Sequence, residues 1–249
     1  MDRPFPTIEV LGVPVAKLLP KDALIQIERI ASEEGAHLIA YANAHTLNLA
    51  TSDPSYRELL RNAAIVLNDG AGIAIAARVN GDRFPANLNG SDFNPLILGL
   101  AGKNGWPVFL LGARPGVAER AGAAMKARYP ALQIAGTRDG YWPAGSDDQV
   151  AAEIRSSGAT LVMAALGNPM QERWLAEHLA ATGARLGVGV GAFFDFAAGE
   201  VPRAPAWMNR MGIEWVFRLL QEPRRLWRRY VVGNPVFLAH VLRDRFSRR

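Results

Sequence analysis

Residues 160–190 read TLVMAALGNPMQERWLAEHLAATGARLGVGV, and this stretch is the clearest indication of the fold class. Thr160–Leu166 is a nearly continuous apolar run, which is typical of a strand buried on both faces of a sheet. Met170–Ala181 is predicted as a helix, and Arg185–Val190 as a second buried strand. A strand, a helix and another strand in this order predict two parallel strands joined by a crossover helix.

The same alternation extends through the chain before residue 160. Further strands are predicted at His37–Ala42, Ala64–Leu67, Pro107–Gly112 and Leu132–Gly136. Helices are predicted at Asp22–Gly35, Thr46–Ala50, Tyr56–Asn62, Ile73–Val79, Gly116–Tyr129 and Asp147–Ser156. No internal repeat interrupts the pattern. The prediction is an α/β fold with a mainly parallel sheet flanked by helices.

The composition fits one globular domain with room for an appendage. Of 249 residues, 49% are apolar and 20% are charged, whereas a disordered chain is poorer in apolar residues. The absence of cysteine excludes a disulfide framework, a thiolate metal site and a cysteine nucleophile. Uncharged apolar runs fall short of the roughly 18 residues of a membrane span, and MDRPFPTIEV is not a signal peptide. We therefore expect a cytoplasmic protein.

Positive charge is concentrated at the C-terminus. Residues 202–249 hold eleven arginines and three acidic residues, a net charge of +8, while the whole chain carries +5 and residues 1–201 therefore −3. Because arginine grips phosphate in a bidentate fork, this segment predicts a phosphate-bearing partner: a membrane surface, a phosphorylated substrate or nucleic acid. A solvated basic helix is the simpler alternative. We divide the chain into a body, residues 1–201, and an Arg/Trp-rich helical appendage, residues 202–249.

Aromatic residues among these arginines favour a membrane surface over a solvated helix. They include Trp207, Trp215, Trp227 and Tyr230. Trp and Tyr prefer the membrane–water boundary, and Arg the anionic headgroups, although the same mixture could stack nucleic-acid bases. The spacing of Trp207, Met211, Trp215 and Leu219 predicts one apolar helical face, which could equally pack on the body. Pro223 is expected to end that helix and open the next.

Polar and glycine-rich clusters follow the predicted strands, at residues 43–46, 68–72, 112–114, 167–169 and 187–191. Ligands of such folds bind beyond the carboxyl ends of the strands, where glycine lets backbone N–H groups approach a phosphate. Neither GxGxxG nor GxxxxGK[ST] is complete, since Ile75 and Phe194 stand where a third glycine would be. A dinucleotide-dependent oxidoreductase is therefore a weak second interpretation, and a nucleic-acid-binding protein that uses the basic tail is another.

Asp69 is the best single candidate for catalysis. It follows a buried strand and precedes glycines, so its carboxylate is expected at the ligand edge of the sheet, although an Asp-Gly pair is most often only a turn. His45 follows another strand, and a lone histidine is more often structural. Neither Asp-x-Asp nor HExxH occurs, which disfavours a metal-bridged diphosphate site.

Three further polar residues have predicted roles. Gln171 could hydrogen-bond a sugar or a base, whereas Glu172, in the same helical turn, is explained by the helix dipole alone. Asp195 stands among the aromatics of Phe193-Phe194-Asp195-Phe196 and needs a partner, for which Arg203 is the expected one.

Four segments together resemble one enzyme family. They are Val66-Leu67-Asn68-Asp69-Gly70-Ala71-Gly72; Ala165-Leu166-Gly167-Asn168-Pro169-Met170-Gln171-Glu172; Gly189-Val190-Gly191-Ala192-Phe193-Phe194-Asp195; and Arg203-Ala204-Pro205 through Glu222-Pro223-Arg224-Arg225-Leu226. The chain is identified on these motifs as similar to the WecG/TagA/CpsF glycosyltransferases. The resemblance runs from about the first strand to Tyr230.

The resemblance implies a Rossmann-like catalytic domain and an inverting glycosyl transfer. The donor is expected to be a UDP-sugar, and the acceptor a glycan linked to polyprenyl diphosphate at the inner face of the cell membrane, in cell-surface polysaccharide, exopolysaccharide or teichoic acid assembly. It implies neither a bound metal nor another cofactor, and no nucleic-acid partner. We expect a cytoplasmic protein that associates peripherally with the membrane and can form a homo-oligomer.

The resemblance also implies residue roles. Asp69 falls on the proposed base, Gln171 on a pocket residue, and Arg218, Arg225 and Arg228 on the appendage arginines that close over the site and serve the diphosphate. Substrate-binding roles are further predicted for Asn43, Asn68, Gly70, Gly112 and Asn168. Some relatives carry a Thr-x-Asn turn where this chain has Tyr41-Ala42-Asn43, so Asn43 is carried over and Tyr41 is not.

Overall fold

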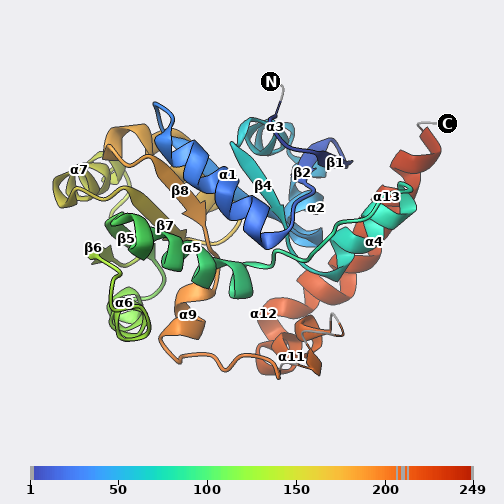
Figure 1. Cartoon of the computed structure of the whole chain (residues 1–249). Coiled ribbons are helices and arrows are strands. Elements are labelled where there is room, and N and C mark those ends of the chain that lie inside the picture. Colours follow the sequence, from blue (N-terminus) through green and yellow to red (C-terminus); the bar gives the residue numbers. More distant parts are fainter. Residues whose placement is uncertain (1–2, 206, 209–210, 212, 248–249) are drawn as a thin grey trace.

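A computed structural model describes residues 3–205, 207–208, 211 and 213–247. Its centre is a six-stranded sheet in which every paired strand is parallel, in the order β4-β3-β8-β7-β5-β6 (Figure 1). The strands are β3 (His37–Ala42), β4 (Ile65–Asn68), β5 (Val108–Gly112), β6 (Ile134–Arg138), β7 (Leu161–Ala165) and β8 (Leu186–Gly189). The predicted α/β fold, Rossmann-like in its parallel sheet flanked by helices, is confirmed.

Helices cover both faces of this sheet because the strands are apolar on both sides. Ile39, Leu110 and Met163 face one core cluster, while Leu38 and Val162 face the other. The first cluster includes α1 (Pro20–Ser32), α5 (Gly90–Asn104), α6 (Val117–Arg128) and α9 (Phe193–Ala197). The second includes α2 (Ala44–Ser52), α3 (Pro54–Asn62), α4 (Ala71–Val79), α7 (Asp147–Ser157) and α8 (Met170–His178). Residues Ala180–Thr182 add one 3₁₀ turn.

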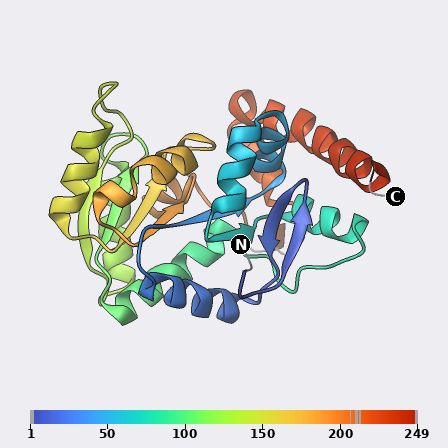
Figure 2. The ribbon, with the colours of Figure 1, turned by 90° about the horizontal axis from the view of Figure 1, so that it is seen from above.

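All six predicted strands and all seven predicted body helices are present, with ends shifted by a few residues. Helices α5 and α9 and a hairpin of β1 (Thr7–Val10) and β2 (Val13–Ala16) were not predicted. The hairpin forms a sheet of its own on the β4 side of the molecule (Figure 2). Its turn residues, Leu11 and Gly12, have φ of +50° and +80°. Such a turn normally carries Asn-Gly or Asp-Gly, and because Leu11-Gly12 is neither, no hairpin was expected here.

The C-terminal segment begins with α11 (Glu214–Gln221) and is then helical throughout 223–247, as α12 (Pro223–Trp227), a π-helical stretch (Arg228–Val232) and α13 (Gly233–Ser247). Pro223 opens α12, as predicted. The expected single face from Trp207 to Leu219 is wrong: the Ile213 N–H bonds to the carbonyl of Met208, five residues back, which is a helix-ending pattern, and α11 begins only at Glu214.

The last helix of the appendage packs on the body. Phe237 and Val241 of α13 belong to the second core cluster, and α13 runs beside α2 and α4 (Figure 1). The side-chain amide of Asn48 donates a hydrogen bond to the Gly233 carbonyl over 2.7 Å. Packing therefore fixes where the arginines before Gly233 lie relative to the sheet.

Candidate active site

Two neighbouring strands place Asn43 and Asp69 side by side. Ala42 of β3 pairs with Asn68 of β4, so the next residue of each strand leaves the sheet at the same edge. The Asn43 Nδ2 donates to Asp69 Oδ2 over 3.1 Å. Asn43 Oδ1 meanwhile accepts the Thr46 N–H over 3.0 Å and so caps α2. The capping bond fixes the amide of Asn43, which in turn orients the Asp69 carboxylate.

The surroundings of Asp69 raise its pKa. Burial is the largest cause, because it disfavours the charged carboxylate. The Asn43 hydrogen bond and the positive charges of Arg229 and Arg218 act in the opposite direction, and the charge of Asp92 adds to the rise. A carboxylate with a raised pKa is a stronger base than a solvent-exposed aspartate, which suits proton abstraction at neutral pH.

Tyr41 does not present its hydroxyl to this site. The hydroxyl donates to Asn94 Oδ1 over 2.7 Å, and both side chains are buried. Burial raises the pKa of Tyr41 well above its usual value, and the Asp69 charge raises it further. The tyrosine at this position is thus tied to α5 by its hydroxyl group.

The appendage brings arginines to this edge from separate helical segments. Arg218 of α11 lies with its guanidinium carbon 5.4 Å from the centre of the Phe196 ring. A hollow of about 380 Å³ is lined by His45, Arg225, Leu226, Arg228, Arg229 and Gly233. Arg225 and Arg228 are exposed, whereas Arg229 is partly buried and its Nε has no hydrogen-bond partner in the described part of the chain.

Arg229 is the residue that the sequence analysis missed. Its positive charge acts on Asp69, and it also acts on His45. Burial first, and then this charge, lower the pKa of His45 to about 4. His45 is therefore neutral at physiological pH, and the positive charge of this hollow comes from arginines alone.

The other half of the sheet edge is built around a buried acid. Glu172 is fully buried, and its Oε1 accepts hydrogen bonds from Asn168 Nδ2 and Gln171 Nε2, each over 2.7 Å. Gln171 Oε1 accepts the Gly191 N–H over 3.0 Å. Two predicted binding residues, Asn168 and Gln171, thus meet through Glu172. The helix-dipole explanation alone is wrong for Glu172, because its carboxylate is hydrogen-bonded in the interior.

Three other predicted residues shape the backbone around the edge. The buried Asn68 donates from Nδ2 to the Ala86 carbonyl over 2.8 Å, and the Gly70 N–H donates to Asn87 Oδ1 over 3.0 Å. Gly112 has φ of +113°, and a Cβ there would lie 2.6 Å from the Ala165 carbonyl group. Close packing thus accounts for this glycine, and binding roles for these three residues stay predictions.

The expected pairing of Asp195 with Arg203 is wrong. Arg203 Nη2 instead lies 2.5 Å from Asp92 Oδ1, which is an ion pair between the appendage and α5. Asp195 is half-buried, and burial raises its pKa while the charges of Arg114 and Arg225 lower it. The sequence interval between Asp195 and Arg203 suggested proximity, but the chain turns away along 199–205 before it reaches α11.

No group of three or more histidine, aspartate and glutamate side chains is arranged as a metal site in the part of the chain that the structure describes. The geometry thus defines a Rossmann-like α/β protein with one partly buried acid at the ligand edge and arginines from a C-terminal appendage around it.

Comparisons with known proteins assign this architecture to a family. Residues 8–249 match the model of the glycosyl transferase WecG/TagA/CpsF family. Over 212 residues the chain is 30% identical to the N-acetylglucosaminyldiphosphoundecaprenol N-acetyl-beta-D-mannosaminyltransferase of Bacillus subtilis (strain 168). The aligned region covers 85% of this chain and 81% of that protein. The chain belongs to the WecG/TagA/CpsF family and is a glycosyltransferase, which decides against the oxidoreductase interpretation.

Proposed function

We propose that this protein transfers a hexose or N-acetylhexosamine from a UDP-sugar to a glycan linked to polyprenyl diphosphate, with inversion at the anomeric carbon and with Asp69 as the general base. The observation that carries the proposal is Asp69 itself: partly buried, oriented by Asn43, raised in pKa and faced by Arg218 and Arg229. The name of the Bacillus subtilis relative makes N-acetylmannosamine the first sugar to test, and N-acetylglucosaminyl diphosphoundecaprenol the first acceptor.

In this mechanism Asp69 takes the proton of the acceptor hydroxyl. The hydroxyl oxygen forms a bond to the anomeric carbon, while the bond from that carbon to the UDP oxygen breaks and its electron pair leaves with the diphosphate. Attack opposite to the leaving group turns an α-linked donor into a β-glycoside, through an oxocarbenium-like transition state. Base catalysis of this kind contributes about 10²–10⁴-fold to the rate.

The negative charge that develops on the diphosphate needs cations near it. We assign this role to the predicted arginines Arg218, Arg225 and Arg228, and we add Arg229. Arg225, Arg228 and Arg229 line one hollow, and preorganised donors that face a developing charge stabilise a transition state more than flexible ones do. The partly buried Arg229 is the most constrained of the three.

The activity test uses purified full-length protein, a panel of UDP-sugars and a polyprenyl-diphosphate N-acetylglucosamine acceptor. We expect turnover with one N-acetylhexosamine donor and a product of inverted configuration by NMR. Asp69→Asn should lower turnover about 10²–10⁴-fold and retain UDP binding, while Asp148→Asn, which changes an exposed acid of α7, should have no effect. Near-normal turnover of Asp69→Asn would remove Asp69 from the role of base.

We also propose that the appendage rests on the cytoplasmic membrane surface. None of the helices in the described part of the chain is long and apolar enough to cross a bilayer. Helix α13 instead buries Phe237 and Val241 against the body and exposes Leu238, Leu242 and Phe246 at four-residue spacing, the last two by 47% and 69%. We assign the membrane contact to this exposed apolar stripe, with Arg243 and Arg245 of the same helix available to anionic headgroups.

Vesicle sedimentation tests the membrane assignment. We expect the wild type to bind vesicles of phosphatidylglycerol and phosphatidylcholine, and the double variant Leu242→Ser/Phe246→Ser to lose most of that binding. Ile25→Ser/Leu96→Ser is the matched control, because these two side chains are similarly exposed elsewhere on the molecule. Equal binding by the α13 variant and the control would exclude this stripe as the membrane surface.

A further inference from the structure

We infer that Glu172 is a positioning residue of the site: its buried carboxylate orients the amides of Asn168 and Gln171, and through them holds the loops after β7 and β8 in the shape that receives the sugar nucleotide. The identity of that ligand rests on the proposed function. Glu172 is fully buried in the first turn of α8, and therefore acts through its neighbours rather than as a catalytic residue.

The hydrogen bonds fix which way each amide points. A carboxylate only accepts hydrogen bonds, so Glu172 Oε1 selects the NH₂ ends of Asn168 and Gln171. This orientation turns the Gln171 oxygen toward the Gly191 N–H, 3.0 Å away in the loop after β8. Asn168, which is only partly buried, then retains one N–H for a ligand, whereas the Gln171 side chain is buried. One carboxylate oxygen thus determines which way the amides of Asn168 and Gln171 point.

Glu172 and Gln171 pack closely against the end of β8. A Cβ on Gly189, the last residue of β8, would lie 2.7 Å from Gln171 Nε2 and 2.9 Å from Glu172 Oε1. Both side chains therefore lie directly against the end of the strand, in space that only glycine leaves open. The network is part of the sheet edge rather than of the outer surface of α8.

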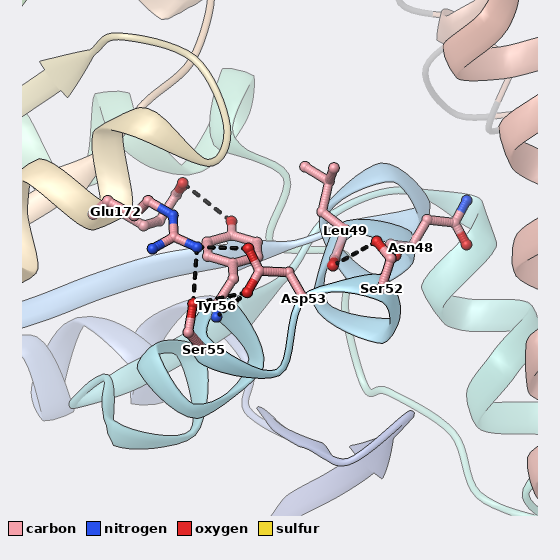
Figure 3. Close-up of polar contacts among 8 residues, drawn as sticks. Asn48, Leu49, Ser52, Asp53, Ser55, Tyr56 and Glu172 are labelled. Atoms are coloured by element: carbon pink, nitrogen blue, oxygen red, sulfur yellow. Dashed lines mark hydrogen bonds and ion pairs between the residues drawn. The ribbon is translucent and has the colours of Figure 1, made fainter.

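A second layer holds the other oxygen of Glu172. Its Oε2 accepts from the hydroxyl of the fully buried Tyr56 over 3.1 Å (Figure 3). The Arg173 guanidinium lies 5.9 Å from the centre of the Tyr56 ring, and its Nη2 donates to Asp53 Oδ2 over 2.6 Å. Asp53 also accepts the Tyr56 N–H and caps α3. The start of α3 therefore supports the second oxygen of Glu172.

Burying the Glu172 carboxylate costs free energy, which indicates that this side chain does more than fill space. Each of the three hydrogen-bond donors to Glu172 is neutral, and burial raises its pKa in spite of them. An apolar side chain would fill such a site at lower cost than an unpaired buried charge. What an apolar side chain cannot provide is an acceptor shared by two amides.

Two substitutions at Glu172 separate the acceptor from the charge. Glu172→Gln keeps an oxygen for both amides and removes the buried charge, so it should fold and bind UDP within a few-fold of the wild type. Glu172→Met keeps the volume without an acceptor, and should weaken UDP binding and raise the KM for the donor by about 10–100-fold, since a misplaced binding group costs that much. The kcat should fall less.

Tyr56→Phe is the matched control. It removes the hydrogen bond to Oε2 and leaves both amides bonded to Oε1, so it should lower the melting temperature without changing UDP affinity. Equal affinity of Glu172→Met and the wild type would overturn the inference, and so would a Glu172→Gln variant as impaired as Glu172→Met. Should Glu172→Met not fold, Gly189→Ala displaces the Gln171 amide instead and should weaken UDP binding to the same extent. Unchanged UDP affinity in a folded Gly189→Ala would also overturn the inference.

A readout without ligand separates this inference from the proposed function. Hydrogen exchange at the Gly191 amide should be slow in the wild type and in Glu172→Gln, and faster in Glu172→Met relative to the core strands. Unchanged exchange would overturn the inference. If the wild type binds neither UDP nor any UDP-sugar while this exchange pattern holds, the proposed function fails and the positioning role of Glu172 stands.

Discussion

The two halves of the sheet edge use an acidic residue in opposite ways. At the ends of β3 and β4, Asp69 is partly buried, has one amide donor and faces arginines of the appendage. At the ends of β7 and β8, Glu172 is fully buried and has three neutral donors. Burial raises the pKa of both, yet only Asp69 is accessible to exchange a proton with a substrate. In the proposed mechanism environment, not residue type, thus separates the half that holds Asp69, the reactive half, from the half that holds Glu172, the supporting half.

The strongest test of this division removes the charge of Arg229, the partly buried arginine of the reactive half. Arg229→Met should lower kcat about 100-fold, because a positive charge that acts on Asp69 and lines the hollow is lost, while UDP affinity should change less. Arg224→Met is the control, since Arg224 is exposed in the neighbouring turn of α12. A kcat for Arg229→Met equal to that of the control would show that the reactive half works without charge from Arg229.

The pH dependence of kcat/KM in Arg229→Met tests the same division. Asp69 must be ionised to accept a proton, so kcat/KM should fall as pH drops through its pKa. Arg229 lowers that pKa, and its removal should move the acidic limb of the profile to higher pH. Glu172→Gln should leave the limb in place, because Glu172 is not part of the proton transfer. A shift in Glu172→Gln would contradict the division.

The reactive half could be predicted from the sequence better than the supporting half. Asn43 and Asp69 directly follow apolar strands, so their meeting at one edge follows from the parallel sheet. The burial of Glu172 had a signal that we did not use: it lies three and seven residues before Leu175 and Leu179, which form the buried face of α8 and its extension. An acid on that face must be hydrogen-bonded in the interior.

The position of Arg229 was harder to predict because two features hide it. It follows Arg228 directly, and composition cannot choose between adjacent arginines. It also lies in the π-helical stretch from Arg228 to Val232, where neither the three- nor the four-residue spacing of an α-helix applies. The packing of Phe237 on the body sets where this stretch lies, and the spacing of residues in the sequence carries no information on that packing.

The melting temperature shows how much stability the ionised Asp69 carboxylate costs, separately from its effect on turnover. The pKa of Asp69 is higher in the folded protein than in the unfolded chain, so its ionisation destabilises the fold, and stability is lost as pH rises through the folded pKa. Asp69→Asn should therefore raise the melting temperature at pH 7. The gain should vanish below about pH 3.9, the pKa of an unfolded aspartate.

Asp82 provides the opposite case for the same measurement. Its hydrogen bond to Lys17 lowers the pKa of Asp82, so its charge is stabilising above the unfolded pKa. Asp82→Asn should lower the melting temperature at pH 7 and lose its effect in acid. If both variants shift the melting temperature in the same direction at pH 7, the raised pKa of Asp69 does not describe its state in the folded protein.

Tyr41 lies at the boundary of the reactive half, and removing its hydroxyl should have a small effect. Tyr41→Phe removes the hydroxyl that bonds to Asn94, whose Nδ2 already has no partner in the described part of the chain. The loss should cost about 1 kcal/mol of unfolding free energy, the usual value for a buried neutral hydrogen bond, and should leave turnover within twofold. A large loss of turnover would mean that the hydroxyl of Tyr41 leaves Asn94 when substrate binds. The reactive half would then include Tyr41 as well as Asn43 and Asp69, and its boundary would depend on the ligand.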